Sequence, residues 1–151
     1  LGLPDNRLDS VALLEVVKAV EQIMAHINPT IIYTHHGGDL NIDHRVAHQA
    51  TMTAARPLPD SKVGAIYSFE TPSSTEWSTA AIGPAFAPNH FVNINDWAAR
   101  KKAALACYDA ELHNFPHARS HVAIEALATW RGASVGLRAA EAFVVERTVK
   151  I

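Results

Sequence analysis

Residues 30–45 read TIIYTHHGGDLNIDHR, and this stretch carries the strongest information about the fold. Its first five residues, Thr30 to Thr34, form a nearly continuous apolar run rich in β-branched side chains, which is typical of a strand buried on both faces. A polar loop with two glycines follows, and it leads into an expected helix from His44 to Arg56. A buried strand followed by a loop and a helix indicates a central parallel sheet.

The segments on either side continue this alternation. An earlier helix is predicted to be capped by Asp9 or Ser10 and to end near Asn28, because its apolar residues follow a three-and-four spacing. A second strand is predicted over Val63–Phe69, and the polar loop Glu70–Ser78 follows it. We therefore expect an α/β, Rossmann-like layered fold with a mainly parallel central sheet flanked by helices, in which both polar loops share one rim.

The remaining elements are less regular. Short strands are predicted at Asn89–Val92 and Ala142–Val145, with helices between them at Asp96–Leu112 and at Ser120–Arg131, the latter stopped by Gly132. The inner face of the first of these two helices is expected to carry Trp97, Ala104, Leu105 and Tyr108. The sequence shows no internal repeat and no interdomain linker, and 151 residues suffice for one core. Residues 1–151 are therefore expected to form a single domain.

The composition excludes several functional classes. Lys and Arg number 13 against 15 Asp and Glu, and a net charge of −2 provides no broad basic field for nucleic acid or anionic lipid. No apolar run approaches the roughly 20 residues that cross a bilayer, so no membrane association is expected. Cys107 is the single cysteine, which rules out an intrachain disulfide and favours a reducing, cytoplasmic setting. Histidine is the outlier, with 9 residues.

The junction between the first polar loop and its helix contains the best candidates for metal binding. Asp43 is predicted to cap the helix, and His44 would occupy the first turn, where the helix dipole disfavours protonation of its imidazole. A neutral imidazole is the form that binds zinc. The alternative is that Asp39, Asn41 and Asp43 only form the turn and the cap, and that His44 is merely exposed.

A family resemblance bears on this choice. Residues 34–45 resemble the second metal motif of the zinc-dependent N-deacetylases of the PIG-L/LmbE type. Three further segments, residues 3–9, 68–77 and 140–143, resemble segments of bacterial members in the same order, so that the resemblance covers nearly the whole chain. It implies an enzyme that uses zinc to remove the N-acetyl group from an N-acetylglucosamine-containing small molecule or glycoconjugate, and family precedent suggests a homo-oligomer.

The resemblance also implies a ligand set that this sequence holds only in part. Family members bind zinc through a His-Pro-Asp-Asp type motif near the amino terminus and through a histidine that matches His44. The sequence contains no His-Pro-Asp-Asp stretch. We therefore expect the domain to be amino-terminally incomplete, without its first strand, and inactive by itself, since a catalytic zinc normally needs about three protein ligands.

Catalytic roles are implied for Asp43, Asn41 and His117. Many members have a histidine where this sequence has Asn41, which can donate a hydrogen bond but cannot carry positive charge. A charged role would then pass to His35, His36 or His117, with His117 preferred.

Substrate binding is expected from Arg7, Glu70 and Trp77, because they lie in loops that would face the same rim. Arg7 could equally be a surface residue and Trp77 a core residue. His48, one turn beyond His44, is expected to pack or to support the site.

Two other functions remain open. The chain could be a catalytically dead relative that serves as a sugar-binding or assembly domain, which the missing motif and Asn41 favour. It could also be another metallohydrolase, in which His44 and His48 bind the metal together with a carboxylate.

Overall fold

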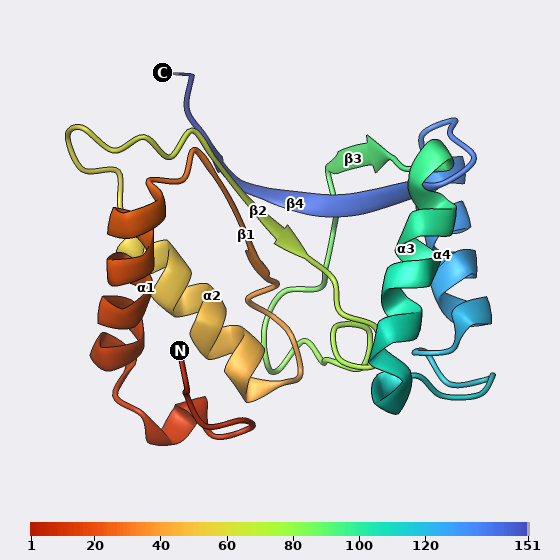
Figure 1. Ribbon diagram of the computed structural model, residues 1–151, viewed down its shortest axis with the longest axis horizontal. Coiled ribbons are helices and arrows are strands. Elements are labelled where there is room, and N and C mark those ends of the chain that lie inside the picture. Colours follow the sequence, from red (N-terminus) through yellow and green to blue (C-terminus); the bar gives the residue numbers. More distant parts are fainter. Residues whose placement is uncertain (151) are drawn as a thin grey trace. The chain divides into compact units, whose positions relative to one another are not determined.

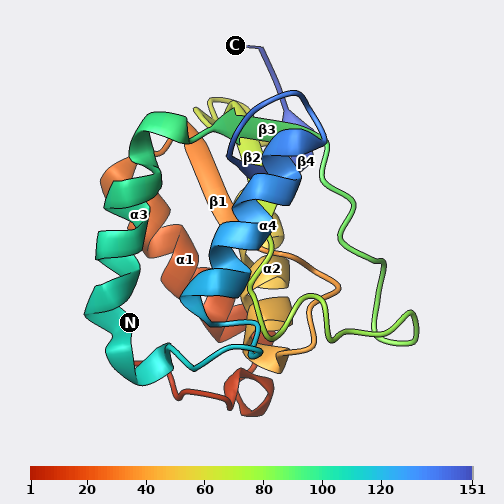
Figure 2. The ribbon, with the colours of Figure 1, turned by 90° about the vertical axis from the view of Figure 1, so that its right-hand side faces the viewer.

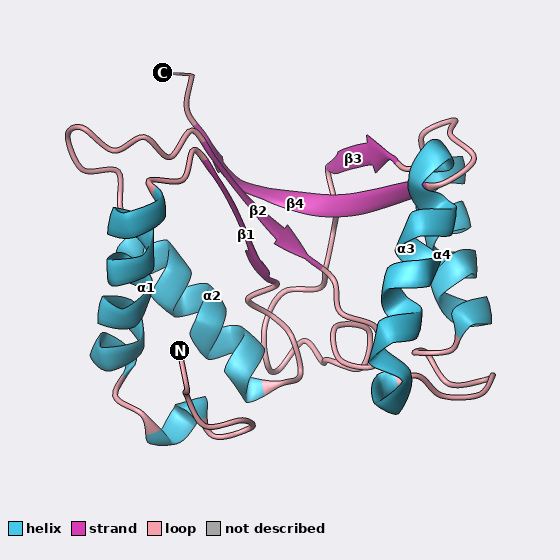
Figure 3. Ribbon diagram, viewed as in Figure 1, coloured by secondary structure: helices cyan, strands magenta, loops and turns pink. Residues whose placement is uncertain are grey.

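The computed structural model describes residues 1–150, which form two compact units. Unit 1 contains residues 1–87 and the chain from residue 144 onward, and unit 2 contains residues 88–143 (Figure 1). The four strands follow the order β1-β2-β4-β3, and β4, Ala140–Thr148, begins in unit 2 and ends in unit 1. The predicted mixed α/β architecture, a sheet flanked by helices, is confirmed (Figure 3).

Unit 1 contains the alternation that the sequence predicts. Its helices and first strands are the 3-10 turn η1 (Leu8–Ser10), α1 (Leu13–Ile27), β1 (Ile31–His35), α2 (Ile42–Ala54) and β2 (Ala65–Phe69). β1 and β2 are parallel and in register from Ile31 opposite Ala65 to His35 opposite Phe69. The two strands therefore end side by side, and the loops that follow them begin at the same edge, as predicted.

The core of unit 1 lies where α1 and α2 cover one face of these strands (Figure 3). Val16 and Val17 of α1 pack against Ala50 of α2. A second cluster contains Ala55, Val63 and Ile66, with Met24, Ile32 and Met52 against it. Apolar side chains on one stripe of each helix and on one face of the sheet thus account for this packing.

The prediction that the strand at residues 30–34, which is part of β1, is buried on both faces is wrong. Ile31 and Tyr33 are 51% and 52% exposed, whereas Thr34 is buried. Successive side chains alternate between the faces, and α2 covers only the face of Thr34, whose hydroxyl lies 3.4 Å from that of Thr51. On the other face, Tyr33 packs against Tyr67 of the neighbouring strand, with ring centroids 5.5 Å apart.

The start of α1 also differs from the prediction. The helix begins at Leu13 with Ala12 as its N-cap, and Asp9 and Ser10 lie in η1 instead. The hydroxyl of Ser10 donates to the carbonyl of Arg7 at 2.7 Å, so it closes a turn rather than capping a helix. The predicted end is confirmed, since Asn28 adopts the left-handed conformation just after Ile27.

Unit 2 consists of a short antiparallel strand pair and helical segments. Its elements are β3 (His90–Asn93), η2 (Asn95–Trp97), α3 (Ala98–Leu105), η3 (Ala106–Glu111), α4 (His121–Ala133) and the start of β4. β3 runs antiparallel to β4, whereas β1 and β2 are parallel, so the expectation of a mainly parallel sheet is supported in part. α3 and α4 lie side by side (Figures 1 and 2), and Lys102 of α3 contacts Glu125 of α4 at 2.6 Å.

Two helix predictions in unit 2 need correction. The expected single helix 96–112 is broken into three pieces, because Tyr108 has non-helical backbone angles. Tyr108 and Trp97 are exposed rather than on an inner face. The helix predicted over Ser120–Arg131 is α4, with Ser120 as its N-cap, but it does not end at Gly132. Gly132 is buried in the last turn, and a Cβ there would lie 2.7 Å from the backbone nitrogen of Ala139.

Candidate metal centre

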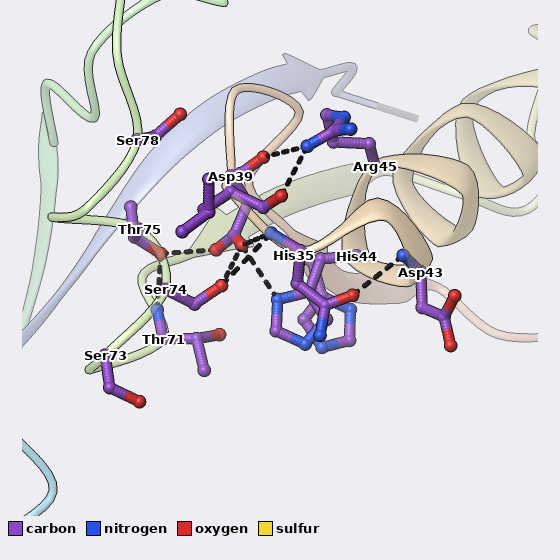
Figure 4. A network of polar contacts seen from close by, with 12 residues as sticks. His35, Asp39, Asp43, His44, Arg45, Thr71, Ser73, Ser74, Thr75 and Ser78 are labelled. Atoms are coloured by element: carbon purple, nitrogen blue, oxygen red, sulfur yellow. Dashed lines mark hydrogen bonds and ion pairs between the residues drawn. The ribbon is translucent and has the colours of Figure 1, made fainter. Parts of the chain in front are cut away.

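The candidate site forms where β1 ends and the chain turns into α2 (Figure 4). Asn41, not Asp43, caps this helix, and the prediction for Asp43 is wrong in this respect. The side-chain oxygen of Asn41 accepts the backbone N–H of Asp43 at 2.8 Å. Asn41 has the extended conformation of an N-cap, whereas Asp43 already lies in the first turn.

Asp43 is used instead to hold the amino-terminal loop. Its Oδ1 accepts the backbone N–H of Leu8 at 2.9 Å, and the amide of Asn41 donates to Asn6 at 3.3 Å. These two contacts join segments that are 35 residues apart in the chain. They attach the loop that carries the exposed Arg7 to the beginning of α2.

His44 packs against two of its neighbours. Its ring is stacked on that of His35, with centroids 4.1 Å apart and the planes 15° from parallel. Its Nδ1 lies 3.0 Å from Oδ1 of Asp39, a close contact whose angle is outside ideal hydrogen-bond geometry. The side chain of His44 is only 16% exposed, so the alternative of a merely exposed histidine is wrong.

Asp39 is fully buried and is the centre of a polar network (Figure 4). Oδ1 accepts the hydroxyl of Ser74 and the backbone N–H of Asn41, the latter at 2.9 Å, and Oδ2 accepts the hydroxyl of Thr75 at 2.6 Å. Burial by itself would raise the pKa of Asp39, but His44 and the three hydrogen bonds together hold this pKa well below its usual range. The carboxylate is therefore charged inside the protein. The sequence predicted Asp39 only as a possible turn-forming residue. It did not predict the hydrogen bonds from Asp39 to Ser74 and Thr75.

The other histidines of this loop have different environments. The pKa of His35 is lowered to about 4, first by burial and then by the neighbouring His44 and His48, against an opposing effect of Asp39. His48 contacts the backbone oxygen of His35 through Nδ1 at 2.9 Å, which fits its predicted supporting role. His36 is buried, and its Nε2 lies 2.9 Å from the backbone oxygen of Pro84.

The loop after β2 lies against this network. Its backbone is folded on itself, since Thr75 Oγ1 accepts the N–H of Thr71 at 2.7 Å and Glu76 Oε1 accepts that of Ser73 at 2.6 Å. Ser78 donates to the carbonyl of Gly38 at 2.5 Å. Trp77 is 52% exposed, so the alternative that it is a core residue is wrong. Glu70, half-buried, begins the same loop.

His117 belongs to unit 2. Its ring packs against that of His113, with centroids 4.2 Å apart, and its Nδ1 accepts the backbone N–H of Arg119 at 3.0 Å. The proposed role of His117 at the metal stays a prediction.

The residues present fit a zinc ion in chemistry but not in number. His44 offers an imidazole oriented by a carboxylate, which is the usual arrangement of a metal-binding histidine. A catalytic zinc needs about three protein ligands. Within residues 1–150, no three His, Cys, Asp or Glu side chains lie close enough together to hold a metal ion. These residues alone therefore do not make a zinc site.

Comparisons with known proteins place the chain in a structural class. A conserved protein from Thermus thermophilus has the same fold, with a TM-score of 0.75 at 20% sequence identity, over 100% of this chain and 66% of that one. N,N'-diacetylchitobiose deacetylase from Pyrococcus horikoshii, solved with its inhibitor MPG, gives a TM-score of 0.65 at 16% identity, over 87% of this chain and 51% of that one. The chain thus spans less than two thirds of the length of either structure. At these identities the likeness shows the fold.

One family model matches the amino-terminal third of the chain. Residues 1–55 match the family model described as PIG-L: GlcNAc-PI de-N-acetylase, and this range includes Asp39, Asn41, Asp43 and His44. No curated protein sequence matches the chain. Over residues 1–55 this match bears out the resemblance predicted from the motifs, and the two solved structures share the fold of the chain. No helix within the described part of the chain is long and apolar enough to cross a membrane.

Proposed function

We propose that this chain carries part of the active site of a hydrolase that removes the N-acetyl group from an acetylated amino sugar. The observation that carries the proposal is the contact between the buried carboxylate of Asp39 and Nδ1 of His44, which leaves the other ring nitrogen for a ligand. The family match spans both residues, and the deacetylase of Pyrococcus horikoshii shares the fold.

The proposed cofactor is zinc, with His44 as one ligand. Zinc supplies a Lewis acid for amide hydrolysis and lowers the pKa of a bound water. Within residues 1–150, no group of three His, Cys, Asp or Glu side chains is placed to hold a metal ion. For this reason we assign only a part of the active site to these residues.

The residues around His44 have distinct tasks in this proposal. Asp39 orients the imidazole of His44, and Asn41 and Asp43 hold the start of α2 and the amino-terminal loop. His35 is neutral at pH 7 because its pKa is about 4, so it can support His44 by stacking but cannot supply a positive charge. A cationic group for the developing oxyanion would then come from elsewhere, with His117 as the remaining candidate.

The substrate-binding residues are proposed from the loops next to the network. The indole of Trp77 is half exposed on the loop that Asp39 holds, and an exposed aromatic face suits the apolar face of a pyranose ring. Glu70 and Arg7 could bind sugar hydroxyls from the same side, since Asp43 ties the Arg7 loop to α2. The substrate class is an N-acetylglucosamine-containing compound.

The second candidate function is a sugar-binding or assembly domain without catalysis. The lack of a complete ligand group among residues 1–150 favours it. So does Asn41, whose side chain is occupied at both ends, by the N–H of Asp43 and by Asn6.

Acetate release separates the two functions. The full-length protein that contains residues 1–151 is loaded with zinc and incubated with N-acetylglucosamine and N,N'-diacetylchitobiose. The proposal predicts acetate release that His44→Gln abolishes and that the exposed control His26→Gln retains. Sugar binding without acetate release by the zinc-loaded protein would support the binding domain and contradict the deacetylase.

A further inference from the structure

The carboxylate of Asp39 joins the ends of two parallel strands. Asp39 belongs to the loop after β1, and its partners Ser74 and Thr75 belong to the loop after β2 (Figure 4). The backbone supports the same junction, because the N–H of Leu40 donates to the carbonyl of Ser74 at 3.3 Å. All of these groups lie within unit 1.

A charged carboxylate that is fully buried needs donors on most of its lone pairs. It has about four lone-pair sites and no proton of its own to donate. The hydroxyl of Ser74 and the N–H of Asn41 donate to Oδ1, and the hydroxyl of Thr75 donates to Oδ2. Nδ1 of His44 lies 3.0 Å from Oδ1 as a further close neighbour, outside hydrogen-bond geometry. An unprotonated Nδ1 would set a lone pair against a buried negative charge, which is costly. The proton of a neutral His44 therefore belongs on Nδ1.

We propose that Asp39 is a positioning residue that selects the Nδ1–H tautomer of His44 and fixes the loop 70–78 beside the same ring. This inference rests on the proposed function for its purpose, because an unprotonated Nε2 is what a metal ion requires. The tautomer itself is a property of the metal-free chain. The buried side chain of Asp39 thus positions both the ring of His44 and the loop that carries Trp77.

The tautomer is measured on the metal-free chain, residues 1–151, with EDTA present. Long-range ¹H–¹⁵N spectra at pH 7.5 distinguish Nδ1–H from Nε2–H, and the His44 signals are assigned by their loss in His44→Gln. We expect His44 to be mainly in the Nδ1–H form, although free histidine in water prefers the Nε2–H form. A His44 protonated on Nε2 would overturn the proposal.

The role of Asp39 is tested with Asp39→Asn, and the exposed Asp60→Asn is the matched control. The buried negative charge of Asp39 is what disfavours an unprotonated Nδ1, so Asp39→Asn, which removes this charge, is expected to raise the Nε2–H fraction of His44. Amide exchange of Asn41 and Thr75 should become about tenfold faster or more. Asp60→Asn should change neither quantity. A folded Asp39→Asn with an unchanged tautomer would contradict the proposal.

The loop contribution has a separate variant. Ser74→Ala removes one donor to Asp39 and leaves its charge, so amide exchange in the loop 70–78 should rise while His44 keeps the Nδ1–H form. Loss of that form in Ser74→Ala would overturn the assignment to Asp39. If Asp39→Asn does not fold, the tautomer of His44 in the native chain and in Ser74→Ala tests the proposal. None of these measurements depends on zinc or on acetate release. A failed deacetylase assay would therefore neither support nor contradict this inference.

Discussion

The rings of His35 and His44 are stacked at 4.1 Å, with His35 at the end of β1 and His44 in the first turn of α2. Two imidazolium ions at this separation would repel each other, and burial adds to the cost of charging His35. The pKa of His35 is accordingly lowered to about 4, by burial first and by His44 next. His35 is therefore a neutral support for the candidate ligand His44 at pH 7.

The stacked pair predicts a pH dependence of stability. An unfolded His35 would take up a proton near its ordinary pKa of 6.5, whereas the folded chain resists protonation until about pH 4. The free energy of unfolding should fall as pH decreases from 6.5 to 4, because the unfolded state then binds more protons. Urea unfolding of the metal-free chain across this range should show a shallower fall for His35→Gln than for the native chain. Parallel curves would contradict the lowered pKa.

The cap of α2 predicts a local stability effect. Asn41→Ala removes the acceptor for the N–H of Asp43 and should lower the free energy of unfolding by about 1 kcal/mol. Asn41→Asp keeps an acceptor at the N-cap and should retain most of the stability. Denaturant unfolding of the three proteins tests this, and equal losses in both variants would mean that Asn41 does not act as a cap.

The contact between Asp43 and Leu8 predicts that the amino-terminal loop can be released selectively. Asp43→Ala removes the acceptor at 2.9 Å, so the amide of Leu8 should exchange faster with solvent, while α1 and β2 keep their protection. Asp9→Ala, which changes an exposed carboxylate in the same region, is the control. Unchanged exchange at Leu8 in Asp43→Ala would show that this bond does not hold the loop.

Gly38 predicts a packing penalty. A Cβ at this position would lie 2.2 Å from the backbone oxygen of Pro84 and 2.9 Å from Nε2 of His36. A backbone oxygen cannot move aside cheaply, so Gly38→Ala should lower the free energy of unfolding by about 1–3 kcal/mol. Gly64→Ala, whose Cβ would meet its nearest atom at 3.3 Å, should cost less. Thermal unfolding compares the two, and the reverse order would contradict the close approach.

The sequence predicted the parts of the fold that depend on local patterns. Strand β1, helix α2 and their common rim with β2 followed from the apolar run and the polar loop of residues 30–45. The exposure of Ile31 and Tyr33 did not follow, because an apolar run does not tell which faces of a strand are covered. The break at Tyr108 likewise depends on backbone angles that no spacing rule contains.

The candidate site was predicted in its residues but not in its connections. His44, Asn41 and Asp43 were named from the motif, but the cap was assigned to Asp43, one of two neighbouring residues of similar capping strength. The bonds from Asp39 to Ser74 and Thr75 span 35 and 36 residues, and no local pattern reveals them. The only sequence feature that hinted at these bonds is the presence of Ser74 and Thr75 in the loop after the next strand.

The central claim is that His44 is a zinc ligand, and zinc content measures it most directly. The full-length protein that contains residues 1–151 is stripped with chelator, reloaded, dialysed and analysed for zinc per chain. The account predicts about one zinc per chain for this protein and for His26→Gln, and almost none for folded His44→Gln. A folded His44→Gln that retains its zinc would contradict it.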